Sequence, residues 1–148
     1  MSHSDSEDGA DSAPASRVVS VAPITLPTSE RGLDLHVRVS APMTGDALPI
    51  ILFSHGNGQS LYAYGPLANH WAANGFVVIQ PTHLDSRMLG LAPNDPRRPH
   101  LWRFREDDLV AVLDGLDRIE GDAPMVAAAV LRGRDFRRSY RRCRGHRE

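Results

Sequence analysis

Two short apolar runs on either side of one helical segment constrain the fold of this chain more than any other feature. Residues 48–53 (LPIILF) and 76–81 (FVVIQP) have the composition of strands that helices cover on both faces. Pro66 and Gly75 stand where a helix between these runs would begin and end. We therefore predict a right-handed strand–helix–strand crossover, with residues 48–53 as a central, parallel strand.

The segments before and after this unit extend the pattern. Residues 17–27 and 33–42 are rich in β-branched side chains, and apolar and polar positions alternate in the second segment. This alternation predicts two antiparallel strands. Residues 101–120 carry apolar side chains at helical spacing, which predicts one helix. The apolar run of residues 125–131 (MVAAAVL) stands where we expect the next parallel strand.

Composition divides the chain into three parts. Residues 1–16 are acidic and lack an apolar period, so we expect a disordered leader. Residues 17–131 hold the single domain that we expect from the length. Residues 132–148 form an arginine-rich tail of irregular structure, with eight arginines against Asp135 and Glu148.

Cys143 is the only cysteine, so no intramolecular disulfide can form. The N-terminus lacks the basic and apolar regions of a secretory signal, and no apolar run is long enough to cross a bilayer. The formal net charge of −1 favours neither nucleic acid nor a membrane surface as a partner. We therefore expect a cytoplasmic protein without a membrane partner.

Four motifs follow one another between Val18 and Glu120: LPIILFSHGNG, PLANHWAANGF, FVVIQPTH and WRFREDDLVAVLDGLD. Their order resembles that of the α/β-hydrolases, within the branch of dienelactone hydrolase, chlorophyllase and platelet-activating-factor acetylhydrolase. The resemblance implies an α/β class protein with a partial α/β-hydrolase fold. In that fold antiparallel strands lead into a parallel sheet with flanking helices, and here it is truncated before the nucleophile elbow.

The turn after residues 48–53 reads His55-Gly56-Asn57-Gly58. In the family that this chain resembles, the residue between the glycines donates its backbone N–H to the oxyanion, so the resemblance assigns that role to Asn57. Gly56 and Gly58 suit a loop that substrate approaches closely, and His55 would brace it. The alternative is an ordinary tight turn at a strand end, because asparagine and glycine favour turns.

The nucleophile of that family lies in Gly-x-Ser-x-Gly, a motif that the sequence does not contain. Its expected place, directly after residues 125–131, holds Arg132–Phe136 without a serine. Ser139 lacks flanking glycines, and Ser60 lies inside the oxyanion loop, where we expect it to steady the following turn. The resemblance places the family's acid and base beyond the elbow, so we expect no catalytic triad.

Three further groups of side chains are candidates for chemistry. His83 and Asp85 follow the second apolar run, and we expect them to shape the substrate cleft rather than to act as base and orienter. Residues 106–108 (Glu-Asp-Asp) point in different directions around a helix, which favours a solvated face. Cys143 and His146 provide two ligands where a structural zinc needs four, so we predict neither a metal nor a cofactor.

Together these features predict an α/β-hydrolase-family protein whose parent activity is serine-dependent hydrolysis of a small-molecule carboxylic ester, but which is truncated and inactive. We attribute the loss to a change of reading frame between Gly121 and Arg132, because a shifted frame in a GC-rich gene encodes much arginine. The alternative function is a non-catalytic interaction protein that binds anionic partners through the arginines of residues 132–147. Nucleic acid is not the expected partner, because no nucleic-acid-binding fold precedes them.

Overall fold

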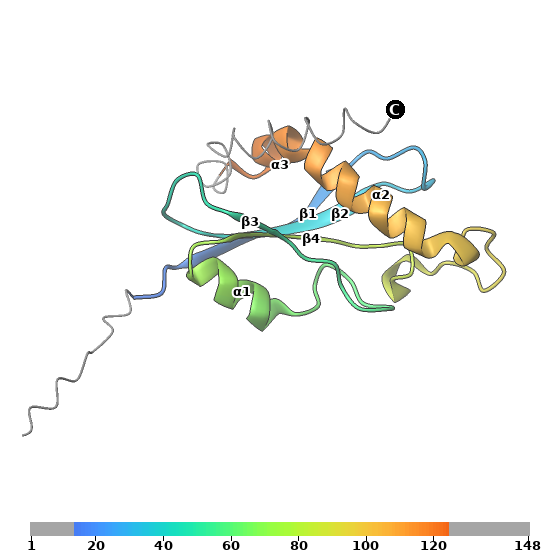
Figure 1. Ribbon diagram of the computed structural model, residues 1–148, viewed down its shortest axis with the longest axis horizontal. Helices are drawn as coiled ribbons and strands as arrows, with labels where there is room; N and C mark the ends of the chain where they lie inside the picture. Colours follow the sequence, from blue (N-terminus) through green and yellow to red (C-terminus); the bar gives the residue numbers. More distant parts are fainter. Residues whose placement is uncertain (1–13, 125–148) are drawn as a thin grey trace, which may run out of the picture.

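The structure, a computed structural model, describes residues 14–124. These residues form one mixed four-stranded sheet with helices on both faces. Side by side in the sheet lie β1 (Val18–Leu26), β2 (Leu35–Pro42), β4 (Val77–Pro81) and β3 (Ile50–Leu52). The helices are α1 (Gly65–Ala73), α2 (Leu101–Asp114) and α3 (Leu116–Asp122), with short 3₁₀ turns η1 (Arg87–Leu89) and η2 (Arg98–His100). In Figure 1, α1 covers one face of the sheet, and α2 with α3 covers the other.

The first two strands pair antiparallel, as their alternating pattern predicts. Their register shifts once, because Val21 lies opposite Val39 whereas Ile24 lies opposite Val37. This shift gives β1 one extra residue, which is a β-bulge. Pro23 lies inside the bulge, where its lack of an N–H costs the ladder no hydrogen bond.

The predicted strand–helix–strand crossover is present, with β3 and β4 parallel. Of these two parallel strands, β4 has a described neighbour on both sides, because it also pairs with β2, and it is buried at all five positions. No strand of the described residues lies on the outer side of β3, whose residues are half-buried. The prediction that residues 48–53 form a central strand depends on a neighbour at residues 125–131, which lie outside the described residues. The apolar composition of residues 48–53 reflects cover on both faces, since Ile50 packs against one apolar cluster and Ile51 against the other.

The helix predicted over residues 101–120 is divided into α2 and α3 at Gly115. A Cβ at Gly115 would lie 3.0 Å from the carbonyl oxygen of Ala111 and 3.1 Å from the side chain of Leu26. The missing side chain therefore lets the helix approach β1 closely, although glycine weakens a helix. Leu116 and Ile119 continue the buried face beyond the break.

The sheet separates two unequal apolar clusters. The larger core joins β1, β2 and β4 to α2 and α3, and the smaller cluster joins β4 to Ala68 and Ala72 of α1. Successive residues of β4 serve both, because side chains alternate across a strand: Val77 and Ile79 face the larger core and Val78 the smaller cluster. The strand β4 therefore contributes side chains to both layers.

Several predicted segments fall outside the described residues, namely most of the leader at residues 1–13, the strand at 125–131 and the tail at 132–148. At the start of the described chain, the N–H of Ser16 donates to the carbonyl of Ala73 at 3.1 Å. Within residues 14–124, every helix is too short or too polar to cross a membrane.

Candidate functional site

Polar side chains gather where β3 and β4 end, beside the first half of α2. The carboxyl ends of neighbouring parallel strands meet at one edge of a sheet, and ligand sites of α/β folds lie at this edge. We call the following seven residues the polar cluster: Arg31, Ser54, His55, His83, Asp85, Arg105 and Asp108. They come from the β1–β2 connection, the two strand ends and α2.

The loop after β3 is a tight turn that is anchored on both sides. The N–H of Gln59 donates to the carbonyl of Gly56 at 3.1 Å, and Gly58 has a φ of +74°, as the third residue of a type II turn requires. The N–H of Gly58 donates to Oδ2 of Asp85 at 3.2 Å, and its carbonyl accepts from the N–H of Arg87 at 3.2 Å. Asn57 is exposed, and its N–H donates to no acceptor among the described residues.

His55 uses both ring nitrogens to hold this loop against β4. The backbone N–H of His83 donates to Nε2 of His55 at 2.9 Å, so Nε2 carries no proton. Nδ1 therefore carries the proton and donates to the carbonyl of Gly56 at 2.7 Å. Burial, the largest influence, lowers the pKa of His55. Electrostatic interactions with His83 and Arg105 lower it further, and together these outweigh the opposing effects of the Gly56 hydrogen bond and of Asp85. The neutral ring thus has no free nitrogen with which to transfer a proton.

A continuous chain of hydrogen bonds runs from Ser54 into the interior. Ser54 Oγ lies 2.8 Å from Nε2 of His83, and Nδ1 of His83 lies 2.8 Å from Oδ2 of Asp108. Arg31 Nη1 donates to the other oxygen, Oδ1 of Asp108, at 2.8 Å. Ser54 is exposed, whereas His83, Asp108 and Arg31 are buried.

Arg105 joins this chain to the loop. Its Nη1 donates to Ser54 Oγ at 3.0 Å and to the carbonyl of His55 at 2.8 Å. Its Nε and Nη2 donate to the two oxygens of Asp85, at 3.1 and 2.7 Å. Burial of Asp85 raises its pKa, but the hydrogen bonds from Arg105 and Gly58 together outweigh burial and leave that pKa below its ordinary value. Asp85 is therefore an ionised anchor for both Arg105 and the loop.

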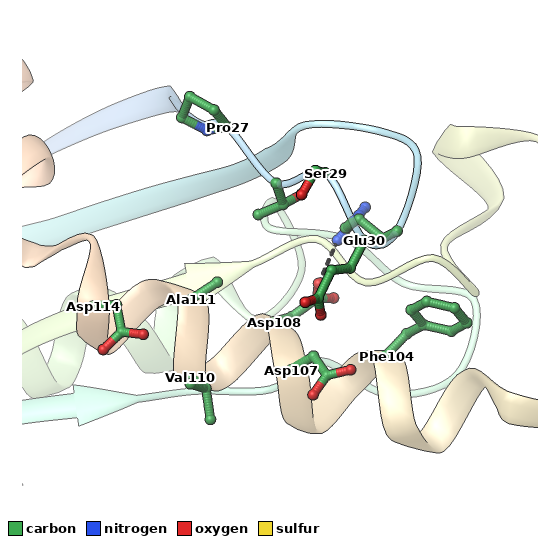
Figure 2. Close-up of a pocket in the computed structure, with 11 residues that line it drawn as sticks. Pro27, Ser29, Glu30, Phe104, Asp107, Asp108, Val110, Ala111 and Asp114 are labelled. Carbon is green, nitrogen blue, oxygen red and sulfur yellow. Dashed lines mark hydrogen bonds and ion pairs between the residues drawn. The ribbon is translucent and has the colours of Figure 1, made fainter. Parts of the chain in front are cut away.

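Two cavities adjoin the polar cluster. One of about 380 Å³ is lined by Asn57, Gly58 and Asp85 together with the segment around η1. The other, of about 290 Å³, lies between α2 and the β1–β2 connection. Figure 2 shows this second cavity, with Asp108 reaching from α2 toward the loop that carries Ser29 and Glu30. Its lining holds one guanidinium against four carboxylates, whereas the first cavity is lined by two guanidiniums and one carboxylate, so the first cavity is the more favourable of the two for negative charge.

The prediction that residues 106–108 form a solvated face is wrong for Asp108. Glu106 and Asp107 are exposed, but Asp108 is buried and bonded to both Arg31 and His83. The sequence contains a signal for this, because Asp108 lies four residues before the buried Val112 and therefore on the same helix face. Sequence reasoning also overlooked Ser54, Arg31 and Arg105, whose contacts join segments that are distant in the chain.

The remaining candidates are placed as follows. The hydroxyl of Ser60 accepts from the N–H of Tyr62 at 3.3 Å, so Ser60 steadies the following turn as predicted. Arg132–Phe136, Ser139, Cys143 and His146 lie outside the described residues. Within residues 14–124, no three histidine, cysteine or acidic side chains are grouped in a way that could hold a metal ion.

Comparisons with known proteins extend this description. A family model described as platelet-activating factor acetylhydrolase, isoform II, matches residues 25–90. The fold is similar to a crystal structure assigned as a dienelactone hydrolase from Klebsiella pneumoniae subsp. pneumoniae MGH 78578, at 18% sequence identity and a TM-score of 0.38. This similarity covers 73% of the present chain and 44% of that one, so the present chain spans less than half of its length. No curated protein matches the chain at a significant level.

Proposed function

We propose, from the α/β-hydrolase-like character of residues 25–90, that the loop His55–Gly58 binds the carbonyl of a carboxylic ester. In this proposal the backbone N–H of Asn57 donates to the oxygen on which negative charge develops. The observation that carries the proposal is that this N–H is free among the described residues, whereas those of Gly58 and Gln59 are engaged. Asn57 is also exposed and lines the cavity of about 380 Å³.

The hydrogen bonds around the loop support a fixed position for this donor. His55 ties the loop to β4, and Asp85 ties it to α2 through Arg105. A donor held in place before substrate arrives stabilises developing charge without reorganisation, and loss of one such donor costs roughly 10²–10³-fold in rate. The alternative of an ordinary strand-end turn does not by itself account for the buried side chains that hold this one.

We further propose that the chain does not hydrolyse esters through the elbow serine of its family. The support is the absence of Gly-x-Ser-x-Gly from the sequence. The arginine-rich composition of residues 132–147 supports a change of reading frame between Gly121 and Arg132 as the cause. The nucleotide sequence around and beyond codon 121 tests this cause, because a Gly-x-Ser-x-Gly motif encoded in another frame would support it and its absence would contradict it.

The substitution Asn57→Pro tests the oxyanion donor. Asn57 is the second residue of the Gly56–Gln59 turn, a position where proline is favoured, so the substitution removes the N–H and keeps the turn. We expect the wild-type protein to hydrolyse p-nitrophenyl acetate faster than buffer does, and Asn57→Pro to reduce the excess rate by roughly 10²-fold or more.

The matched control is Asn57→Ala, which removes the side chain but keeps the N–H. We expect it to retain the wild-type rate, because the proposed donor belongs to the backbone. Undiminished hydrolysis by Asn57→Pro would contradict the proposal, and so would a wild-type protein with no rate above buffer.

A further inference from the structure

We propose that Ser54 is a nucleophile toward carboxylic esters, with His83 as its general base and Asp108 as the residue that positions His83. The choice of an ester as substrate rests on the function proposed above, whereas the choice of residues rests on the geometry of the polar cluster. The serine lies at the end of β3, the histidine at the end of β4 and the aspartate on α2.

The hydrogen bonds that link Ser54, His83 and Asp108 run in the direction that removal of the serine proton requires. The carboxylate of Asp108 only accepts, so the proton of His83 lies on Nδ1 at the 2.8 Å contact. Nε2 of the neutral ring is then an acceptor, and the hydroxyl of Ser54 donates to it at 2.8 Å. Both distances lie within the range that a nucleophile, its base and the orienting acid need.

Burial distinguishes the two ends of the Ser54–His83–Asp108 hydrogen-bond chain: the serine end is accessible and the aspartate end is not. Ser54 is exposed, whereas His83 is 0% and Asp108 2% exposed. An ester can therefore reach the serine oxygen, while water does not compete for the hydrogen bond between His83 and Asp108. Among the described residues, Ser54 is the serine whose hydroxyl contacts a histidine.

Two arginines place positive charge beside the hydrogen-bond chain of Ser54, His83 and Asp108. Arg31 donates to Oδ1 of Asp108 at 2.8 Å, which leaves Oδ2 for the hydrogen bond with His83. Arg105 contacts Ser54 Oγ at 3.0 Å, so its positive charge stabilises negative charge on that oxygen. The same contact makes Oγ less basic, and for this reason we expect slow turnover.

The reaction proceeds by acyl transfer to the serine. Ser54 Oγ attacks the ester carbonyl carbon while its proton passes to Nε2 of His83. The bond from this carbon to the alkoxy oxygen then breaks, and the proton on Nε2 passes to that oxygen, so an alcohol leaves and an acyl ester of Ser54 remains. Water attacks the acyl ester, gives one proton through His83 to Oγ, and releases a carboxylic acid with regenerated Ser54.

Labelling with diisopropyl fluorophosphate tests the nucleophile directly. Ser54 Oγ displaces fluoride from phosphorus, and the resulting phosphoester is stable enough to be located by mass spectrometry of peptides. We expect one label per chain on the wild-type protein, at Ser54. Ser54→Ala is expected to remove the label and to bring p-nitrophenyl acetate hydrolysis to the buffer rate.

The matched control is Ser20→Ala, which removes an exposed hydroxyl on β1 that contacts Ser40 and Arg38 and no histidine. It is expected to keep both the label and the rate. Asp108→Asn places a donor against Nδ1 of His83, so the ring proton moves to Nε2, and we expect labelling at Ser54 at least roughly 10²-fold slower. Circular dichroism of each variant establishes that it is folded.

An unlabelled wild-type protein, a label at another residue, or a label that persists in Ser54→Ala would each overturn the proposal. These outcomes can be separated from a failure of the oxyanion loop. If Ser54 is labelled but Asn57→Pro hydrolyses esters at the wild-type rate, only the role of Asn57 fails. If Asn57→Pro slows hydrolysis but Ser54 takes no label, only the role of Ser54 fails.

Discussion

The polar cluster and the larger apolar core lie next to each other under α2, but different forces hold them together. Asp108 and Val112 are one helical turn apart on the same face, and both are buried. Val112 contacts other apolar side chains of the core, whereas both oxygens of Asp108 accept hydrogen bonds, from Arg31 and His83. One face of one helix thus crosses from the apolar core into the polar cluster.

This comparison shows which property of a side chain matters in each region. In the apolar core, stability follows the volume and apolar area that are buried, because dispersion and the hydrophobic effect are non-directional. In the polar cluster, stability depends on whether each buried donor and charge keeps its partner. Substitutions that change volume and charge separately are therefore the sharpest way to compare the two regions.

The largest effect is expected for Asp108→Asn, which changes the charge but hardly the volume. It leaves the guanidinium of Arg31, which is 3% exposed, without its carboxylate. Breaking a buried ion pair in this way costs about 3–5 kcal/mol, which urea denaturation measures as a loss of unfolding free energy. The control is the neighbouring Asp107→Asn, which is exposed and is expected to change stability by less than about 0.5 kcal/mol. A similar loss of unfolding free energy in Asp108→Asn and Asp107→Asn would contradict the importance of the buried ion pair.

A smaller effect is expected for Ile79→Val, which changes volume alone in the apolar core. Ile79 is 0% exposed and packs in the larger core, so loss of one methylene should cost about 0.5–1.5 kcal/mol in the same measurement. Ile51→Val serves as its control, because Ile51 is only half-buried and should lose less. If Ile79→Val cost as much as Asp108→Asn, volume rather than charge would be the limiting property in both regions.

The smallest effect is expected from protonation of His55. Because burial lowers its pKa in the folded protein, the unfolded chain binds this proton more tightly. Its contribution to stability is complete above the unfolded pKa of about 6.5 and is lost as pH falls from there toward the lower folded pKa. The slope from one such group is at most about 1.4 kcal/mol per pH unit.

Urea denaturation between pH 7.5 and pH 5 measures this slope. In His55→Asn we expect a shallower dependence, because the amide retains a donor for the Gly56 carbonyl but does not titrate. His70→Gln, at an exposed position on α1, should keep the wild-type slope. An unchanged slope in His55→Asn would assign the acid sensitivity to another group.

Much of the fold was predictable because periodicity reports which faces of a segment are buried. The alternation in residues 33–42 predicted a strand with one buried face, and the continuous apolar runs predicted strands covered on both faces. Strand order was not predictable in the same way, and the predicted second neighbour of residues 48–53 lies at residues 125–131, outside the described residues. Two-sided cover and a central position give the same composition, and only the pairing of β4 with both β2 and β3 distinguishes them.

The candidate site was predictable only where its residues are neighbours in the sequence. The glycine-rich turn after β3 could be inferred from residues 55–58, since its conformation depends on local backbone freedom. Asp108 was misplaced because three acidic residues in succession resemble an exposed helix face, although its spacing from Val112 pointed inward. Nothing local connects Ser54 with His83.

The sequence by itself determined the segments that become strands and helices, and the turn that can present Asn57. Only the tertiary structure decided which polar groups meet: Ser54 and His83 are 29 residues apart in the chain, and Arg31 and Asp108 are 77 apart. The physical reason is that apolar burial and hydrogen bonding differ in how strictly they depend on geometry. Burial of an apolar face is satisfied by many arrangements, whereas a hydrogen bond needs two atoms within about 3 Å, and only the packing of α2 against the ends of β3 and β4 fixes that separation.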